Sequence, residues 1–331
     1  MCRSQSQSLD EGKEMVYGSS NVHLRYSQAI LFWEDMMKIT NNHNLPQSFV
    51  DFARNDKYSK GNADISVTSL IDSPRVRKMR DHFHEHRVVD VVDNIWALFG
   101  TAVHHVLESS EPSDDVVLEE RMFATVDGWV LSGAVDHQKI YGQAVEITDY
   151  KVTSVWSVIH GKIDWERQLN VYAYLVQRNK GKKVRKLSIC AILRDWSNRE
   201  AKMKPDYPQS PVVIVDIPMW DEMKRIEYIH KRIALHQEAD LKYDLETEEA
   251  ERFSNCNDEE RWKRSDAWAV KKKGLKRAMR VFDNEDDAKD FMAEQSVPVE
   301  IEYRAGELVR CNGNYCGVAE FCSQYKKEIS K

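Results

Sequence analysis

Asp149 and Lys151 place a carboxylate and an amine two residues apart within QAVEITDYKV, residues 143–152. If this segment is a β-strand, side chains two apart point to the same face, so both groups would face one site. A carboxylate binds hard divalent cations through oxygen, and such a cation polarises a phosphate and activates water. A lysine beside that water could stabilise the developing charge. The pair therefore permits phosphodiester hydrolysis, whereas an exposed ion pair on a strand is the commoner explanation of this pattern alone.

The preceding predicted strand adds a second carboxylate, Asp136, directly after the apolar segment at 130–135. Adjacent pairing of the two strands would bring Asp136 opposite Asp149. Two like charges at one place repel unless a cation lies between them. Gly133, on the same strand, leaves room for a close backbone approach.

A predicted helix over residues 88–108 contributes a histidine. At 100° per residue, Phe99 and Val106 fall on one apolar stripe. His104 flanks this stripe, so it can face a buried site, whereas His105 points away and should be solvated. A histidine at the edge of the core with a satisfied hydrogen bond is the alternative.

Gln168 and Tyr172 lie one turn apart on a further predicted helix, residues 164–180. Gln168 could bind a phosphate or a water, and Tyr172 could contact DNA or the site. Ordinary helix surface is the alternative for both residues.

Together these residues resemble the PD-(D/E)XK nuclease superfamily, and within it the RecB-like branch of CRISPR adaptation nucleases and phage exonucleases. That branch carries G-x-x-x-H on a helix, then G-x-x-D, then (D/E)-x-K, then Q-x-x-x-Y. The same order occurs here at Gly100…His104, Gly133…Asp136, Asp149-Tyr150-Lys151 and Gln168…Tyr172. The resemblance covers about residues 64–196, and it implies a restriction-endonuclease-like core.

The resemblance also implies roles for individual residues. The implied ligands of Mg²⁺ or Mn²⁺ are His104, Asp136, Asp149 and the main-chain carbonyl of Tyr150. Lys151 would orient or activate the attacking water, and Gln168 and Tyr172 would complete the catalytic site. Glu119 or Glu120 matches an acidic position that is often found on the first strand of the family.

Cys311, Cys316 and Cys322 are close together near the end of the sequence, which in a reducing compartment suggests a metal or an iron–sulfur cluster. Many RecB-like relatives take a fourth ligand from S-x-L-x-x-C-P, but here SLIDSP at 69–74 lacks the cysteine. Phage members place one before a tryptophan-containing stretch, which here is Cys256. The resemblance therefore implies a [4Fe–4S] cluster on these four cysteines. Spacing alone leaves tetrahedral Zn²⁺ open, and free thiols are the ordinary alternative.

The bulk charge argues against a nucleic-acid partner, because the formal net charge is −6. Its distribution permits one: residues 236–260 hold ten acidic and two basic residues, and residues 256–282 hold nine basic and four acidic residues. The candidate DNA-binding residues in the second segment are Lys271, Lys272, Lys273, Lys276 and Arg277. Basic residues interleaved with aromatic ones can follow a DNA backbone, and a solvated loop is the alternative.

We expect a mixed-sheet α/β nuclease core over residues 88–245, in which Asp127-Gly128 forms the turn of a hairpin. A flexible polar tail at 1–20, an N-terminal helical region at 21–87 and a cysteine-clustered region at 246–331 would surround it. Helices are predicted at 24–40, 68–83, 88–108, 164–180 and 219–243. Strands are predicted at 116–126, 129–140, 143–152, 186–196 and 211–220.

The expected function is a divalent-metal-dependent DNA exonuclease in phage recombination or DNA processing. The expected partners are DNA and a recombination partner protein. A non-catalytic DNA-binding module on the same fold and a structural zinc protein are the alternatives. The absence of an apolar run long enough to span a membrane, and of a hydrophobic segment in residues 1–15, predicts a cytoplasmic protein, in the host cell if phage-encoded.

Overall fold

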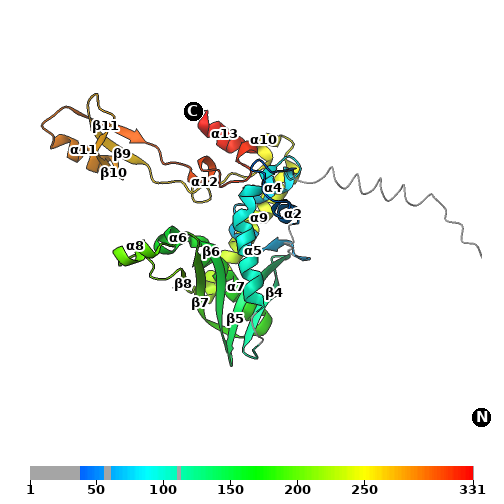
Figure 1. The fold of residues 1–331 in the computed structure, drawn as a ribbon. Coiled ribbons are helices and arrows are strands. Elements are labelled where there is room, and N and C mark those ends of the chain that lie inside the picture. The colour runs from blue at the N-terminus through cyan, green and yellow to red at the C-terminus, as the bar shows by residue number, and fades with distance from the viewer. Residues whose placement is uncertain (1–37, 56–60, 110–112, 331) are drawn as a thin grey trace, which may run out of the picture.

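A six-stranded mixed sheet flanked by helices forms the centre of the computed structural model, which describes residues 38–55, 61–109 and 113–330 (Figure 1). Its strands are β2 (Ile65–Ser66), β4 (Val116–Val126), β5 (Trp129–Tyr141), β6 (Ala144–Thr153), β7 (Lys183–Leu193) and β8 (Val212–Asp216). The expected fold class, a mixed α/β core, is confirmed.

Strand β5 organises this sheet. It pairs antiparallel with β4 along most of its length, through a turn in which Asp127 and Gly128 both have positive φ, as a tight two-residue hairpin requires. Its second half pairs antiparallel with β6, and β6 pairs parallel with β7. A parallel pair needs a crossover, and the helices α6 (Val155–His160) and α7 (Ile163–Lys180) supply it.

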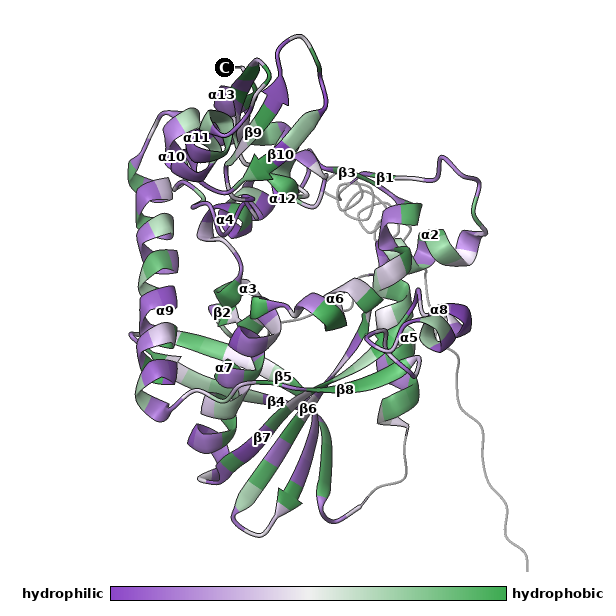
Figure 2. Cartoon of the chain, turned by 90° about the vertical axis from the view of Figure 1, so that its left-hand side faces the viewer, coloured by the Kyte–Doolittle hydropathy of each residue, from purple (hydrophilic) through white to green (hydrophobic). Residues whose placement is uncertain are grey.

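Helices cover both faces of the sheet. Helix α7 packs against β4 and β7 and buries ten of its side chains, and it ends at Gly181 in the left-handed conformation. Helix α5 (Ile95–Glu108) contacts β6 and has no fully buried residue. The long helix α9 (Glu222–Leu245) packs on α7 and on α4 (Pro74–His82), so it joins the sheet core to the cysteine region (Figure 2).

Two smaller groups of elements lie outside this core. The short strand β1 (Lys38–Thr40) pairs parallel with β3 (Val88–Asp90). In the C-terminal part, β9 (Ala267–Lys272) lies between β10 (Ala278–Phe282) and β11 (Val299–Arg304), and α11 (Glu285–Ala293) packs on this sheet. The remaining elements are α2 (Gln47–Arg54), α3 (Val67–Ile71), η1 (Val91–Asn94), α8 (Asn198–Met203), α10 (Glu249–Arg252), α12 (Val309–Asn312), η2 (Ala319–Phe321) and α13 (Ser323–Ile329).

Three predicted helices need correction. The helix expected at 68–83 is two helices, α3 and α4, because residues before a proline are driven out of the helical conformation, and Pro74 begins α4. The helix expected at 88–108 starts only at Ile95, after β3 and η1. Of the helix expected at 24–40, residues 38–40 form β1, and the rest lies outside the described residues, as does the tail at 1–20.

The N-terminal region is therefore not purely helical, and the sheet β10-β9-β11 in the C-terminal region was not predicted. Among the helices of the described residues, none combines the length and apolar character needed to cross a membrane.

Candidate metal and catalytic site

Three side chains from different elements meet beside the sheet. His104 from α5, Glu119 from β4 and Asp136 from β5 place their ligand atoms within 4.8 Å of one another. The imidazole lies between the two carboxylates, with Nδ1 3.0 Å from Glu119 Oε1 and Nε2 3.8 Å from Asp136 Oδ2. An imidazole nitrogen together with carboxylate oxygens is a donor set that Mn²⁺ and Mg²⁺ accept.

The sequence left open whether Glu119 or Glu120 belongs to the site, and the structure places Glu119 there. The β4–β5 pairing passes from Leu118↔His137 to Glu120↔Val135, and Glu119 between them has a φ of 48°. Such an irregularity turns a side chain out of the normal strand alternation, and irregularities of this kind are common beside active sites. Glu120 is engaged elsewhere, 2.5 Å from Lys180 Nζ. The residue pattern contains no signal for this bulge, which is why the sequence could not choose between the two glutamates.

Asp149 and Lys151 lie next to this group on β6. Lys151 Nζ is 2.8 Å from Asp149 Oδ2, and Gln168 Nε2 donates to Asp149 Oδ1 at 3.2 Å. Gln168 also donates to the Tyr172 hydroxyl at 2.9 Å. The main-chain nitrogen of Tyr150 donates to Asp136 Oδ2 at 2.8 Å, so it ties the two groups together.

The side chains that the sequence selected for catalysis therefore converge in space, from three strands and two helices. His105 is exposed, as expected. The apolar stripe that was to flank His104 is not buried, however: Phe99 and Val106 are 48% and 69% exposed.

The electrostatics of the site reflect crowded carboxylates. Burial, and then the charge of Asp149, raise the pKa of Asp136 to about 7. The hydrogen bond that Glu119 accepts from the imidazole raises the pKa of His104 against the opposing effect of burial. Burial alone would lower the pKa of Lys151, but Asp149 and Asp136 outweigh it and the net shift is upward.

A divalent cation fits these residues. Asp149 is 1% exposed, and within the described chain its Oδ2 has the Lys151 ion pair but no hydrogen bond of good geometry. Buried polar atoms are usually satisfied, so such an atom needs an explanation. A cation held by His104, Glu119 and Asp136, with Asp149 beside it, would supply one and would offset the repulsion between carboxylates.

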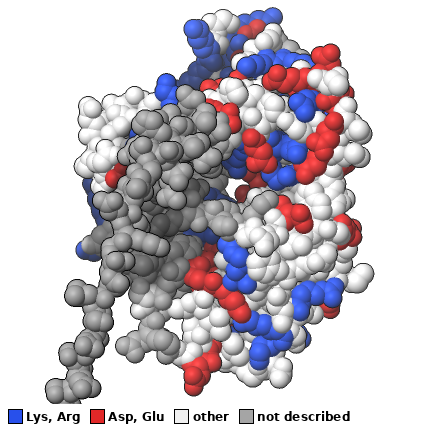
Figure 3. Space-filling model, turned by 90° about the vertical axis from the view of Figure 1, so that its right-hand side faces the viewer, with Lys and Arg blue, Asp and Glu red and all other residues white. Residues whose placement is uncertain are grey.

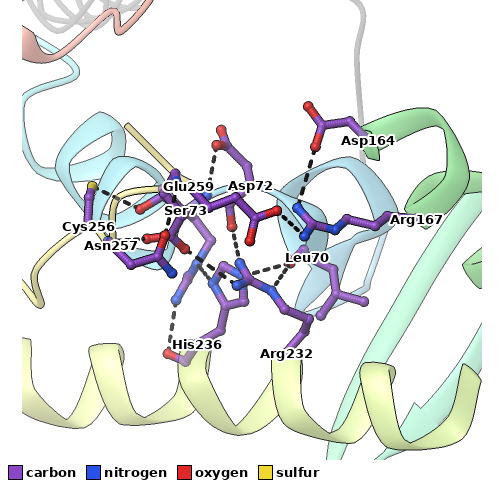
Figure 4. Close-up of polar contacts among 12 residues, drawn as sticks. Leu70, Asp72, Ser73, Asp164, Arg167, Arg232, His236, Cys256, Asn257 and Glu259 are labelled. Atoms are coloured by element: carbon purple, nitrogen blue, oxygen red, sulfur yellow. Dashed lines mark hydrogen bonds and ion pairs between the residues drawn. The ribbon is translucent and has the colours of Figure 1, made fainter. Parts of the chain in front are cut away.

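The four selected cysteines line one small cavity of about 20 Å³ in the C-terminal region: Cys256, Cys311, Cys316 and Cys322. Ser73 Oγ lies 3.2 Å from Cys256 Sγ, although the two residues are 183 positions apart (Figure 4). Ser73 directly precedes Pro74, the first residue of α4. The structure thus places Cys256 beside the beginning of α4.

The surroundings of the thiols suit a thiolate-bound metal. Burial raises the pKa of Cys256 to about 12, so this thiol is neutral unless a metal displaces its proton. Arg75 is 1% exposed and donates through Nε to Cys322 Sγ at 3.3 Å, a buried positive charge beside the sulfurs. Cys190 lies on β7 in the sheet, away from this set, and Cys2 is outside the described residues.

An ion-paired cavity of about 410 Å³ lies between the core and the cysteine region (Figure 4). Arg310 contacts Asp72 at 2.7 Å, and Arg167 lies 3.8 Å from Asp164. Arg80 Nη1 lies 3.2 Å from Asp72 Oδ2. The arginines that line this cavity are already paired with carboxylates. We therefore interpret the cavity as part of an ion-paired contact between α3, α7 and the segment around residue 260.

The basic run that was selected for DNA binding is the tip of the β9–β10 hairpin. Lys271 is on β9, where its ammonium lies 3.4 Å from Glu300 and 3.0 Å from Glu302. Lys273, Lys276 and Arg277 are exposed on the turn, and the exposed Lys272 is the last residue of β9. On the face drawn in Figure 3, basic and acidic side chains are interspersed over the surface.

Comparison with protein-family models gave no match, and neither did comparison with curated proteins. Among solved structures, the chain is similar to "SSO0001", with a TM-score of 0.37 and 17% identity over 58% of this chain and 83% of that one. It is also similar to a "Putative exonuclease" from Eubacterium rectale, with a TM-score of 0.26 and 13% identity over 68% and 88%. Because both TM-scores lie below 0.5, the reading of the site stands on the geometry of this chain alone.

Proposed function

We propose that the protein is a DNA exonuclease that hydrolyses phosphodiester bonds with Mg²⁺ or Mn²⁺. The observation that carries this proposal is the convergence of His104, Glu119 and Asp136 beside the Asp149–Lys151 pair. The resemblance to RecB-like nucleases supplies the finer expectation, a role in phage recombination or DNA processing with a recombination partner protein.

Each residue of the site has a distinct task in this proposal. A bound divalent cation would polarise the phosphate and lower the pKa of a water. Lys151, held 2.8 Å from Asp149, presents a positive charge to the place where negative charge develops. Gln168 fixes the orientation of Asp149 through one hydrogen bond and that of Tyr172 through another.

Two other functions are a non-catalytic DNA-binding module and a structural zinc protein. A non-catalytic DNA-binding module has no use for several carboxylates crowded around a histidine, because their repulsion costs stability and repels DNA. In a structural zinc protein the cysteines would matter and the carboxylates would be incidental. The hydrogen bond from the main-chain nitrogen of Tyr150 to Asp136 links the two groups of the site and favours a common task for these carboxylates.

The test is an end-labelled nuclease assay with single- and double-stranded DNA in Mn²⁺. We expect progressive loss of the labelled end by the wild-type chain and loss of at least a hundredfold in rate for Lys151→Ala, in line with the removal of one charge-stabilising donor. Lys186→Ala is the matched control, because Lys186 also lies 2.8 Å from an aspartate, Asp216, but on an exposed surface. Activity that survives in Lys151→Ala, or internal cuts without loss of the end, would contradict the proposal.

A [4Fe–4S] cluster on Cys256, Cys311, Cys316 and Cys322, with Zn²⁺ as the alternative, completes the proposal. All four cysteine residues line one cavity, and soft thiolate ligands suit both groups. Such a group would hold the C-terminal region against α4, because Cys256 contacts Ser73 and Arg75 of α4 contacts Cys322.

A further inference from the structure

Helix α5, which carries His104, presents two large aromatic rings to solvent. Trp96 is 51% exposed and Phe99 is 48% exposed, and their ring centroids are 5.8 Å apart. Both residues lie N-terminal to His104 on the same helix, within about 12 Å along its axis at 1.5 Å per residue. Exposed aromatic rings in a pair are costly in water, so this surface needs a partner.

Positive charge surrounds these rings. The guanidinium carbon of Arg194 lies 4.4 Å from the centre of the Trp96 ring. Arg194 follows β7, and its main-chain nitrogen bonds to the carbonyl of Thr153 at 3.0 Å, so it lies at the same end of the sheet as Lys151. Burial lowers the pKa of Lys162, the charge of Asp164 raises it, and the charges of Arg194 and Lys151, which lie near it, lower it again.

The cations are available to a ligand. Within the described residues, neither Arg194 nor Lys162 forms an ion pair with a carboxylate, unlike the arginines of the 410 Å³ cavity. Arg194 occupies one face of Trp96, and half of that side chain nevertheless remains exposed. A half-exposed aromatic pair beside cations that form no ion pair among the described residues matches one class of ligand, a chain of planar rings joined by phosphates.

We propose that Trp96, Phe99, Arg194 and Lys162 form a stacking platform that binds a single-stranded segment of the nucleic-acid substrate beside the metal site. Bases stack on Trp96 and Phe99, and phosphates lie against Arg194 and Lys162. A duplex offers only base edges and backbone, because its base faces are already stacked, so an unpaired strand is the occupant. This inference rests on the proposed nuclease function and adds the substrate class to it.

The test measures binding apart from catalysis. Fluorescence anisotropy with the full chain in EDTA compares a labelled oligo(dT), an abasic oligonucleotide of equal length and a blunt hairpin duplex. For the double variant Trp96→Ala/Phe99→Ala we expect Kd for oligo(dT) to rise about tenfold or more, with the abasic strand and the duplex unchanged, since only stacking is lost. Arg194→Gln should weaken oligo(dT) and the abasic strand alike, because it removes a phosphate contact.

Tyr141→Ala is the matched control, since Tyr141 is also an exposed aromatic side chain, 39% exposed at the tip of the β5–β6 hairpin. It should leave all three affinities unchanged, and circular dichroism should show the same fold in every variant. Unchanged oligo(dT) binding in the double variant, absence of oligo(dT) binding by the wild type, or equal losses for the abasic strand and the duplex would each overturn the platform.

These outcomes are distinct from failure of the nuclease proposal. If oligo(dT) binding depends on the two rings but no cleavage occurs in Mn²⁺, the platform stands and the nuclease function falls. If cleavage occurs and needs Lys151 while oligo(dT) binding ignores the rings, the nuclease stands and the platform falls.

Discussion

Gly133 shows how one residue can govern the geometry of the whole site. A Cβ at this position would lie 2.8 Å from a ring carbon of Tyr172 and 2.8 Å from a methyl of Val67. The sequence suggested a close approach at this glycine, and the structure shows that side chains make it. Gln168 forms hydrogen bonds with both the Tyr172 hydroxyl and the Asp149 carboxylate. A displaced Tyr172 would therefore disturb the carboxylate beside Lys151.

We therefore predict that Gly133→Ala destabilises the protein by about 1–3 kcal/mol, the usual cost of overpacking a core. It should also lower nuclease activity. Gly100→Ala is the control, because nothing lies within 4 Å of a Cβ there and alanine favours a helix interior by roughly 0.5–1 kcal/mol. Urea unfolding of both variants measures the two free energies. Equal stabilities for the two variants would show that the contacts at Gly133 relax without cost.

At the scale of elements, the sequence predicted the parts of the fold whose signals are local. The strands of the core alternate in hydrophobicity, and Asp127-Gly128 marks their hairpin, so Asp136, Asp149 and Lys151 were placed on the correct strands. The first turns expected for α5 are instead β3, because Val88 and Val89 pair with residues 38–39, and a partner that distant in sequence leaves no local pattern.

The C-terminal sheet escaped prediction for a different reason. Its strands are short and charged, and Lys271 of β9 is satisfied across the sheet by Glu300 and Glu302 of β11. Because of this cross-strand pairing, Lys271 at the start of the basic run belongs to a strand, although the sequence pattern is typical of a solvated loop. The apolar stripe of α5 differs from expectation in the opposite direction: Phe99 and Val106 follow helical spacing, but no element among the described residues buries them.

The contact between Cys256 and Ser73 yields a prediction for the metal-binding elements. Cys256→Ser should lose the metal, whereas Cys256→Ser/Ser73→Cys should regain it, because Ser73 Oγ and Cys256 Sγ are 3.2 Å apart. Metal analysis of anaerobically purified protein, with the visible absorbance of an iron–sulfur cluster near about 400 nm, measures this. Cys190→Ser is the control, since Cys190 is a strand residue outside the cavity.

The rescue separates the ligand role of Cys256 from a packing role. If Cys256 only packed against its neighbours, the single variant would keep its metal and the second change would add nothing. A colourless protein loaded with zinc would retain the four ligands but reject the iron–sulfur cluster.

At the scale of the whole molecule, α9 connects the sheet core to the cysteine region, and a buried histidine lies at the joint (Figure 4). His236 is fully buried, and Arg77 Nε of α4 donates to its Nδ1 at 3.0 Å. The other ring nitrogen, Nε2, then carries the proton and donates to the carbonyl of Leu70 in α3 at 3.1 Å. A second proton would have to bind at Nδ1, against the arginine.

Burial, and then the charges of Arg77 and Arg232, lower the pKa of His236 from 6.5 to about 3. Between these two values the unfolded chain binds a proton at this histidine and the folded chain does not, so stability is retained above pH 6.5 and falls as the pH drops toward 3. From pH 7 to pH 5 this one group should cost about 2 kcal/mol of unfolding free energy. His236→Gln keeps a neutral polar side chain that cannot titrate, so its free energy of urea unfolding should depend less on pH by that amount. If both proteins lose the same stability over this range, the histidine at the joint is not held neutral, and α9 does not couple the two regions through it.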